Sequence, residues 1–343
     1  MNDSDTASST SEAAADPGFH VPTWMHLLSG WIHRNPRLWI RLGNVETRAV
    51  ADVTADHRVD RPIFVAGLAR SGTTVLLEQL AAHPQVASHR YIDYPPVLTP
   101  YWWNRWLDMV PRATEIARER AHQDGISITS QSPEAFEEVL WMAFFPEAHD
   151  PARSSVMGRQ HTHREFERFY DEHLRKLLAV RKRQRYVAKG NYNLVRLGYL
   201  HRLYPDARFV LAIRDPVWHI ASLIKQHRLF LAGESAEPRA LEHMRRVGHY
   251  EFGLDRRPIN IGEVEPWRPR PDGARPAGSH NSGSRAAKWK AGRTIGRRST
   301  AMSQRYWTPM PRCGKPAWWC AMKPCAASPR RLLPRSSSTV RCP

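Results

Sequence analysis

A glycine-containing loop between an apolar strand and a helix constrains the fold of this 343-residue chain more than any other feature. Residues 62–66 form a short apolar run, the pattern of a buried strand. Residues 73–82 carry apolar side chains at helical spacing, and a His-Pro pair follows them. The loop Gly67-Leu-Ala-Arg-Ser-Gly72 has the glycine spacing of a Walker A phosphate loop. Its backbone N–H groups and the helix N-terminus predict an anion site.

One substitution in this loop narrows the chemistry. Thr73 stands where a Walker A loop has the lysine that reaches the β and γ phosphates of a nucleotide. A threonine at the lysine position argues against ordinary ATP or GTP chemistry. Arg70 supplies a cation from within the loop, and its planar guanidinium suits bidentate contact with a sulfate or phosphate. A tight turn that serves packing alone is the alternative.

The rest of the chain alternates strands with helices. We expect further strands at 186–189 and 208–213, and helices at 100–116, 132–145, 164–182, 193–204 and 215–230. Ser132 and Asp215 are the expected caps of two of these helices. The pattern predicts an α/β fold, a phosphate-loop type of parallel sheet with helices on both faces.

Here the sequence resembles a known family. The stretch Pro62-Ile-Phe-Val-Ala-Gly-Leu-Ala-Arg-Ser-Gly-Thr-Thr-Val-Leu-Leu, followed by Ala82-His-Pro-Gln-Val, is similar to the 5′-phosphosulfate loop of PAPS-dependent sulfotransferases. It is closest to the branch that holds the protein-tyrosine sulfotransferases and many bacterial members. The resemblance implies a donor, 3′-phosphoadenosine 5′-phosphosulfate (PAPS), and no metal. Its 5′-phosphosulfate would be held by Arg70, Ser71, Gly72, Thr73 and Thr74.

A second motif resembles the 3′-phosphate site of the same family. Arg214 ends an apolar strand and Ser222 follows eight residues later, in the next helix. Arg214 therefore lies at the carboxyl end of a strand, where α/β sheets bind ligands. Lys189, at the end of the preceding strand, is a partial match to a family lysine because Gly190-Asn191 follows it. Solvated strand-end positions are the alternative for Arg214 and Lys189.

The catalytic base is the weakest part of the resemblance. Transfer of a sulfonate needs the acceptor deprotonated as it attacks. The family branch places a Glu shortly after the His-Pro pair, where this chain has none. Asp93 is the preferred base and His89 the second choice, and ordinary turn or loop roles are the alternatives. The acidic helix face of Glu134, Glu137 and Glu138 either lines an acceptor pocket or is simply amphipathic.

The charge of the chain is concentrated in its C-terminal part. The formal net charge is +18, yet residues 266–343 hold 17 Lys or Arg and one acid. The preceding residues are nearly neutral and give no electrostatic footprint for nucleic acid. All four cysteines lie in the same tail, without paired C-x-x-C spacing, so a zinc module is not expected.

The tail itself does not resemble the end of a folded protein. Residues 266–343 carry 11 of the 27 prolines, and strand and helix periodicities stop near residue 258. Shifting the codons of residues 317–325 by one base permits Leu-Val-Val-Arg-Tyr-Glu-Thr-Leu, which resembles a strand of the sulfotransferases. We hypothesise a frameshift, real or a sequencing error, near codons 258–267. A chain made as written would then lack parts that complete the sheet, and its activity would be in doubt.

These observations predict three regions: a disordered N-terminus at 1–20, an incomplete sulfotransferase-like domain at 21–257, and a disordered or non-native tail at 258–343. The predicted function is transfer of a sulfonate from PAPS to a hydroxyl or amine of a small-molecule, glycan or lipid acceptor. There are two alternatives. One is a phosphate-loop kinase, and the other is a basic protein that binds nucleic acid or membrane surfaces through its tail. Residues 24–42 fit either a surface-packed helix or one lying on a membrane. With no signal or spanning segment, the cytoplasm is the expected location.

Overall fold

The structure is a computed structural model that describes residues 18–111 and 115–262. The predictions for residues 1–17 and for the tail from residue 263 onward, the frameshift included, lie outside the described residues. Residues 258–262 are described and pack against the body. The Asn260 side-chain amide donates to the Pro151 carbonyl at 2.8 Å, and the backbone carbonyl of Asn260 accepts from the Ser155 N–H.

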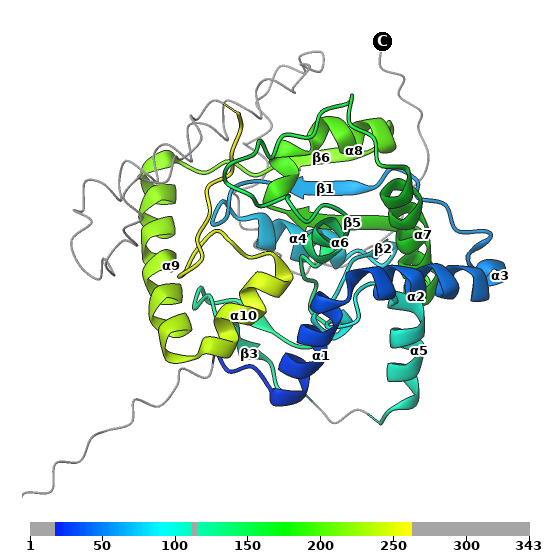
Figure 1. The fold of residues 1–343 in the computed structure, drawn as a ribbon, viewed down its shortest axis with the longest axis horizontal. Helices are drawn as coiled ribbons and strands as arrows, with labels where there is room; N and C mark the ends of the chain where they lie inside the picture. The colour runs from blue at the N-terminus through cyan, green and yellow to red at the C-terminus, as the bar shows by residue number, and fades with distance from the viewer. Residues whose placement is uncertain (1–17, 112–114, 263–343) are drawn as a thin grey trace, which may run out of the picture. The chain divides into compact units, whose positions relative to one another are not determined.

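A four-stranded parallel sheet forms the centre of the described residues (Figure 1). Its order is β2 (Val86–Ala87), β5 (Arg185–Gly190), β1 (Ile63–Ala66) and β6 (Arg208–Leu211). In β1, Ala66 pairs with Gly190 of β5 and with Leu211 of β6, so these three strands end together. The strands predicted at 62–66, 186–189 and 208–213 are confirmed.

Helices cover both faces of this sheet, as predicted. Alternate side chains of β1 point to opposite faces. Val65 packs with Leu77 of α4 (Thr73–Ala81), while Phe64 belongs to the larger core with α6 (Glu137–Phe144) and α7 (Arg164–Arg181). The fold is therefore a parallel α/β sheet between helical layers, and the expected fold class is confirmed.

The remaining elements surround this centre. They are α1 (Thr23–Arg34), α2 (Pro36–Ala49), α3 (Ala51–Thr54), the turn η1 (Tyr91–Asp93), α5 (Pro100–Met109), the turn η2 (Tyr192–Val195), α8 (Leu197–Leu203), α9 (Pro216–Ala236) and α10 (Pro238–Val247). A separate antiparallel hairpin joins β3 (Arg118–Glu119) to β4 (Ser127–Ile128). The hairpin and α10 are elements that the sequence patterns did not predict.

Several predicted helix boundaries are wrong. The single helix expected over residues 24–42 is divided at Asn35 into α1 and α2. The helix predicted from 132 begins only at Glu137, because Pro133 bridges to Arg90 and the Ser132 hydroxyl accepts from the Thr129 N–H instead of capping a helix. The helix predicted to reach residue 116 ends at Met109. The helix predicted at 193–204 is divided into η2 and α8. By contrast, Asp215 caps α9 as predicted, since its carboxylate accepts from two N–H groups of the first turn.

Candidate functional site

The predicted phosphate loop joins β1 to α4 and has the backbone of an anion site. Gly72 adopts a φ of 98° and Arg70 a φ of 71°, both in the left-handed region that turns N–H groups inward. A Cβ on Gly67 would lie 2.5 Å from the Ser71 hydroxyl oxygen, so glycine is needed there. That hydroxyl is buried and has no hydrogen-bond partner among the described residues. The loop therefore presents both backbone and side-chain donors.

Arg70 links this loop to the second predicted motif. Its Nε donates to the Ser222 hydroxyl on α9 at 3.2 Å, and its carbonyl accepts from the Arg214 guanidinium at 3.1 Å. Arg214 follows the carboxyl end of β6 and is exposed, so most of its donors face solvent. The structure thus brings together two motifs about 150 residues apart, as the spacing of the sequence predicts.

Lys189 joins the same group from the neighbouring strand. It lies near the end of β5, next to β1, and its Nζ donates to the Thr74 hydroxyl at 3.2 Å. Burial lowers its pKa, whereas the negative charge of Glu134 opposes that change. The predicted residues therefore gather at the carboxyl ends of β1, β5 and β6. One set of contacts joins Arg70 to Ser222 and Arg214, and another joins Lys189 to Thr74 of the same loop.

The β3–β4 hairpin adds two charged residues that the sequence did not identify. Arg120 is 7% exposed and donates to the Thr74 hydroxyl at 3.3 Å. Asp124 accepts from both Arg120 and Arg70, each at 2.5 Å. Burial alone would raise the pKa of Asp124, but these guanidiniums lower it to about 2. The segment has no strand or helix periodicity, so only its polar Asp-Gly turn signals a hairpin.

Glu134 is the acidic side chain that faces this cluster from the segment before α6. Its carboxylate accepts from the Tyr91 hydroxyl and from the Ala135 N–H. Burial would raise its pKa, but the charges of Lys189 and Arg120 and these hydrogen bonds lower it below the usual carboxyl value. An ionised carboxylate therefore lies beside the cations of the phosphate loop.

The two predicted bases occupy other surroundings. Asp93 is 1% exposed and accepts from the Arg90 N–H, the Asn104 amide and, at 2.5 Å, the Arg181 guanidinium. His89 is 2% exposed and contacts the ring of His173 at 2.9 Å and the Tyr186 hydroxyl at 3.1 Å. None of these contacts among the described residues reaches the loop. The base role of Asp93 and His89 stays a prediction.

Histidines and aromatic rings extend the site away from the loop. The ring of His122, on the hairpin, lies 5.0 Å from Phe230 and 5.4 Å from His249. Burial and then the charges of Arg120 and its neighbours lower the pKa of His122 well below its usual value. His243 on α10 contacts Tyr94, and burial lowers its pKa to about 4. Neutral imidazoles and aromatic faces thus adjoin the charged cluster.

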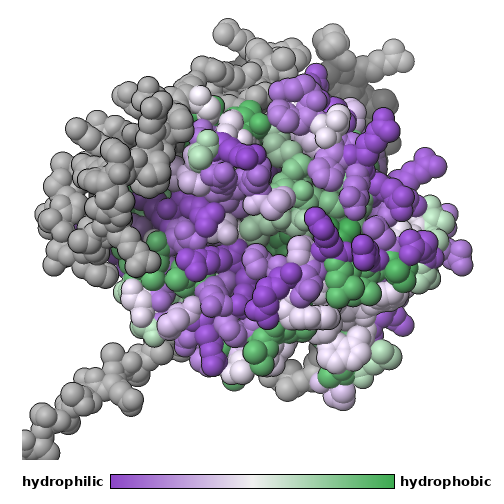
Figure 2. Space-filling model, in the orientation of Figure 1, coloured by the Kyte–Doolittle hydropathy of each residue, from purple (hydrophilic) through white to green (hydrophobic). Residues whose placement is uncertain are grey.

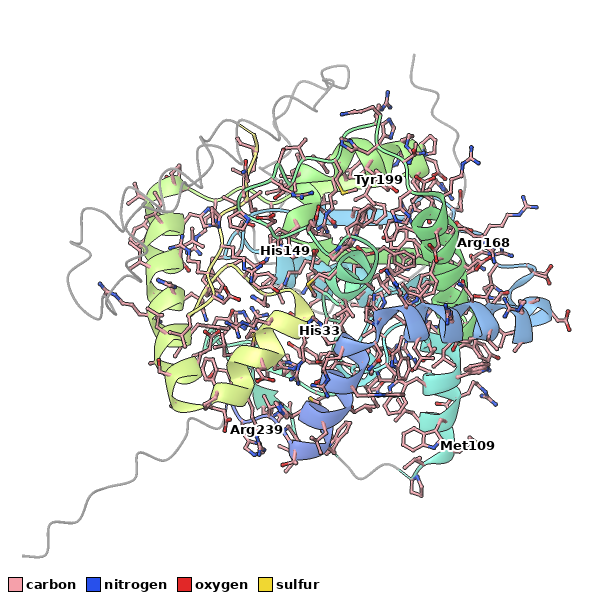
Figure 3. All side chains as sticks on the ribbon, viewed as in Figure 1. His33, Met109, His149, Arg168, Tyr199 and Arg239 are labelled. Carbon is pink, nitrogen blue, oxygen red and sulfur yellow. The ribbon has the colours of Figure 1, made fainter. Side chains whose placement is uncertain are left out.

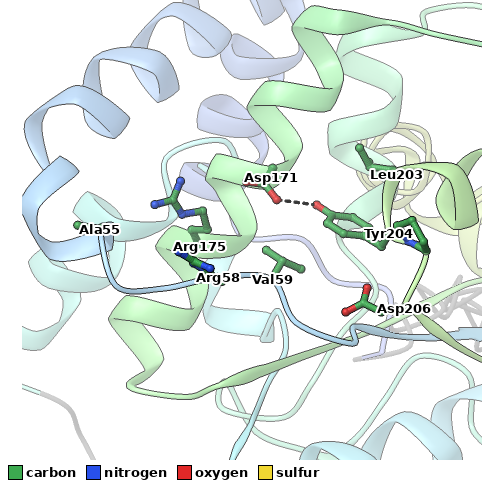
Figure 4. A pocket seen from close by; sticks show the side chains of 9 residues that line it. Ala55, Arg58, Val59, Asp171, Arg175, Leu203, Tyr204 and Asp206 are labelled. Carbon is green, nitrogen blue, oxygen red and sulfur yellow. Dashed lines mark hydrogen bonds between the residues drawn. The ribbon is translucent and has the colours of Figure 1, made fainter.

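A pocket at the opposite end of the sheet is separate from this cluster. It measures about 500 Å³ and is lined by Arg58, Asp171, Arg175, Tyr204 and Asp206 among others (Figure 4). Val59 precedes β1 and Asp206 precedes β6, so the pocket adjoins the amino ends of the strands. Ligands of open α/β sheets bind at the carboxyl ends. The pocket therefore does not mark the candidate site.

The cluster is chemically suited to a polyanion. Four cations, Arg70, Arg120, Lys189 and Arg214, gather there; Arg70 and Arg120 share the Asp124 carboxylate, and Glu134 and Glu251 act on Lys189 through their charges. Among residues 18–111 and 115–262, no group of three His, Cys, Asp or Glu side chains could hold a metal ion. Over the same residues, no helix combines the length and apolar character needed to cross a membrane.

Comparison with known proteins identifies the class. The model of a family described as "Sulfotransferase family" matches residues 62–257, more than half of the chain. The chain therefore belongs to the sulfotransferase family. The matched span contains the phosphate loop, Lys189, Arg214 and Ser222.

Two crystal structures of mycobacterial sulfotransferases are also similar, each at 17% identity. The Mycobacterium avium enzyme matches with a TM-score of 0.35, over 61% of this chain and 63% of its own. The match thus spans less than two thirds of that protein. The Mycobacterium tuberculosis H37Rv enzyme matches with a TM-score of 0.37, over 70% of this chain and 80% of its own. No curated protein sequence matches the chain.

Proposed function

We propose that this chain is a sulfotransferase that moves a sulfonate from PAPS to a hydroxyl or amine of its acceptor. The observation that carries the proposal is the contact between Arg70 and Ser222. It joins the loop expected to hold the 5′-phosphosulfate to the residues expected to hold the 3′-phosphate. One nucleotide with anionic groups at both ends would use both sets of donors.

The residues of the loop fit such a donor. The buried Ser71 hydroxyl has no partner among the described residues, and a Cβ added at Gly72 would meet nothing within 4 Å. The 5′ end would be held by the loop amides, Arg70, Ser71, Thr73 and Thr74. Arg214 and Ser222 would hold the 3′-phosphate. The donor supplies the sulfonate that is transferred.

The chain's own cations would stabilise charge during transfer. Negative charge develops on the sulfonate and on the leaving phosphate, and preorganised donors stabilise it most strongly where water is excluded. Lys189 and Arg120 are both buried and both donate to the Thr74 hydroxyl, which places their charges together beside the loop. We therefore assign them to the sulfonate end of the site.

We assign the general base to Glu134 rather than to Asp93 or His89. A base must reach the acceptor beside the transferred group. Glu134 is the carboxylate that interacts with Lys189, Arg120 and Tyr91, whereas Asp93 is paired with Arg181. Its lowered pKa keeps it ionised at neutral pH, ready to accept the proton of the acceptor.

The remaining predictions concern context. A small-molecule, glycan or lipid acceptor, a cytoplasmic location and the frameshift near codons 258–267 remain proposals. Resequencing the gene tests the last of these: an unbroken frame in high-quality reads rejects a sequencing error.

Calorimetric titration tests the donor proposal. The ligand is 3′-phosphoadenosine 5′-phosphate, the product nucleotide, with ATP as the comparison, and the proteins are the full chain and Arg70→Ala. We expect micromolar binding that prefers the 3′-phosphate nucleotide and is lost in the variant. Equal binding of ATP, or no binding by a chain shown to be folded by circular dichroism, would contradict the proposal.

A further inference from the structure

Helix α1 exposes a line of large apolar side chains. Trp24 is 54% exposed, Leu27 64% and Trp31 44%. Their spacing of three and four residues puts them on one side of the helix. The opposite side of α1 is buried through Ser29, Gly30 and Ile32. The exposed line is therefore not the side of α1 that packs on the body.

Helices α2 and α5 carry similar lines in which arginines alternate with apolar residues. On α2 the exposed side chains at this spacing are Leu38, Arg41, Val45 and Arg48. On α5 they are Trp102, Arg105, Trp106 and Met109, the last of which is 73% exposed. We call the exposed residues of these three helices the Trp–Arg surface.

Direct contacts show that the three helices are neighbours. The rings of Trp31 on α1 and Trp39 on α2 meet edge to face at 5.5 Å. The Glu46 carboxylate of α2 accepts from the Trp102 N–H at the start of α5, at 2.6 Å. Figure 2 shows hydrophobic and strongly hydrophilic side chains side by side where these helices lie, and Figure 3 places Met109 at the far end of α5.

The charge of this surface is positive. The exposed arginines of the three helices are Arg34, Arg37, Arg41, Arg48 and Arg105. Their acidic residues are Glu46 and Asp108 alone. The Glu46 carboxylate is fully buried against Lys176, so Asp108 is the one exposed carboxylate that these three helices carry.

We propose that the Trp–Arg surface docks on a membrane whose headgroups are anionic. Tryptophan prefers the boundary between headgroups and acyl chains, and arginine pairs with lipid phosphates. Leu27, Val45 and Met109 would enter the acyl boundary beside them, as in amphipathic helices that lie on membranes. An isologous dimer through this surface would instead bring the arginines of two copies into one interface. The inference does not rest on the proposed enzymatic function.

Vesicle co-sedimentation of the full chain tests this inference. The vesicles contain phosphatidylcholine with or without phosphatidylserine, at low and at high salt. One variant, Leu27→Asp with Met109→Asp, introduces charge at the two most exposed apolar positions of the Trp–Arg surface. Another, Arg41→Glu with Arg48→Glu, reverses charge on α2. The matched controls are Leu254→Asp and Lys225→Glu, exposed residues outside the surface.

The basic residues beyond 262 are the same in every protein, so differences between variants report the Trp–Arg surface. We expect each double variant to bind phosphatidylserine vesicles about tenfold more weakly than the controls, and the unaltered chain to retain part of its binding at high salt. Equal binding by all proteins would overturn the inference. A dimer seen in sedimentation velocity, dissociated by the same variants while vesicle binding is unchanged, would overturn it in favour of a second copy.

Discussion

Buried cations pair with carboxylates in different ratios in the packed body and at the phosphate loop. In the body each buried cation has its own carboxylate: Lys176 pairs with Glu46 at 2.7 Å, Arg181 with Asp93 at 2.5 Å and Arg196 with Glu138 at 2.7 Å. At the loop, Arg70 and Arg120 share the single carboxylate of Asp124.

This difference shows where a ligand is expected. A charge removed from water is costly unless it is paired, so one-to-one pairs hold the helices in place and leave no charge available. At the loop two guanidiniums share one carboxylate, and the side chain of Arg70 is 18% exposed, so an anion can reach it. The pairing of charges therefore distinguishes the helices that form the scaffold from the loop that is expected to bind a ligand.

The largest expected effect comes from breaking a pair in the body. Arg196 is 2% exposed and binds Glu138 with two N–H groups. His149, which is labelled in Figure 3, contacts the same carboxylate at 2.7 Å. Glu138→Ala leaves a buried guanidinium unpaired and should lower the free energy of unfolding by about 3–5 kcal/mol. Urea denaturation measures it. The control Glu147→Ala removes an exposed partner of Arg153 and should cost less than about 1 kcal/mol. Equal losses would show that burial is not the cause.

Removing a cation from the loop should weaken ligand binding strongly and change the free energy of unfolding little. Arg70→Ala should weaken binding of 3′-phosphoadenosine 5′-phosphate by about 100-fold, because charge-assisted hydrogen bonds are lost. Its effect on unfolding should be small, since it also relieves excess positive charge. Calorimetry and urea denaturation on the same protein measure both. Arg168→Ala, an exposed arginine of α7, is the control and should change neither. If Arg70→Ala lowered the free energy of unfolding as much as Glu138→Ala, the proposed difference between the loop and the packed body would be wrong.

Acid should destabilise the body through its neutral histidines. Burial lowers the pKa of His89 and of His243 to about 4, against 6.5 when unfolded. The unfolded chain therefore binds more protons between pH 6.5 and 4, so stability falls as pH falls through that window, by about 1–3 kcal/mol. Glu137 opposes this, because burial raises its pKa to about 7. The stability that protonated Glu137 contributes is present below about pH 4.5 and is lost as pH rises to about 7.

Thermal unfolding between pH 7 and 4 measures this dependence. His89→Gln should make the fall in Tm with acid shallower, and Glu137→Gln should make it steeper. The two variants thus serve as each other's control. If the slope of Tm against pH were the same in both variants as in the unaltered chain, His89 would not be neutral and Glu137 would not be protonated in the folded state at these pH values.

The smallest expected effect concerns the shared carboxylate. Asp124→Asn removes the charge that partly neutralises Arg70 and Arg120, so binding of 3′-phosphoadenosine 5′-phosphate should strengthen by about three- to tenfold. Calorimetry measures it, with Asp108→Asn on α5 as the control. Weaker binding in Asp124→Asn would mean that Asp124 positions the guanidiniums rather than competing with the ligand.

The sequence was most informative where the signal is local. The strand, loop and helix around Arg70 are contiguous, and the strand-end positions of Lys189 and Arg214 follow from short apolar runs. Strand ends of a parallel sheet converge, so the sequence could predict that these residues meet.

The parts that were missed depend on contacts between distant segments. Asp93 is near the loop in sequence, yet it pairs with Arg181, 88 residues away. Arg120 and Asp124 reach the loop from a hairpin of two-residue strands, too short to show alternation. Glu134 was noticed only as part of a helix face, whereas the helix begins three residues later.

The preference for a 3′-phosphate tests the central claim, that two distant motifs form one donor site, most directly. Calorimetry compares 3′-phosphoadenosine 5′-phosphate with adenosine 5′-phosphate on the full chain, Arg214→Ala, Ser222→Ala and the control Arg208→Ala. We expect the unaltered chain and the control to prefer the 3′-phosphate nucleotide by tenfold or more, about 1.4 kcal/mol, and both site variants to lose most of that preference. Equal binding of the two nucleotides by the folded, unaltered chain would contradict the claim.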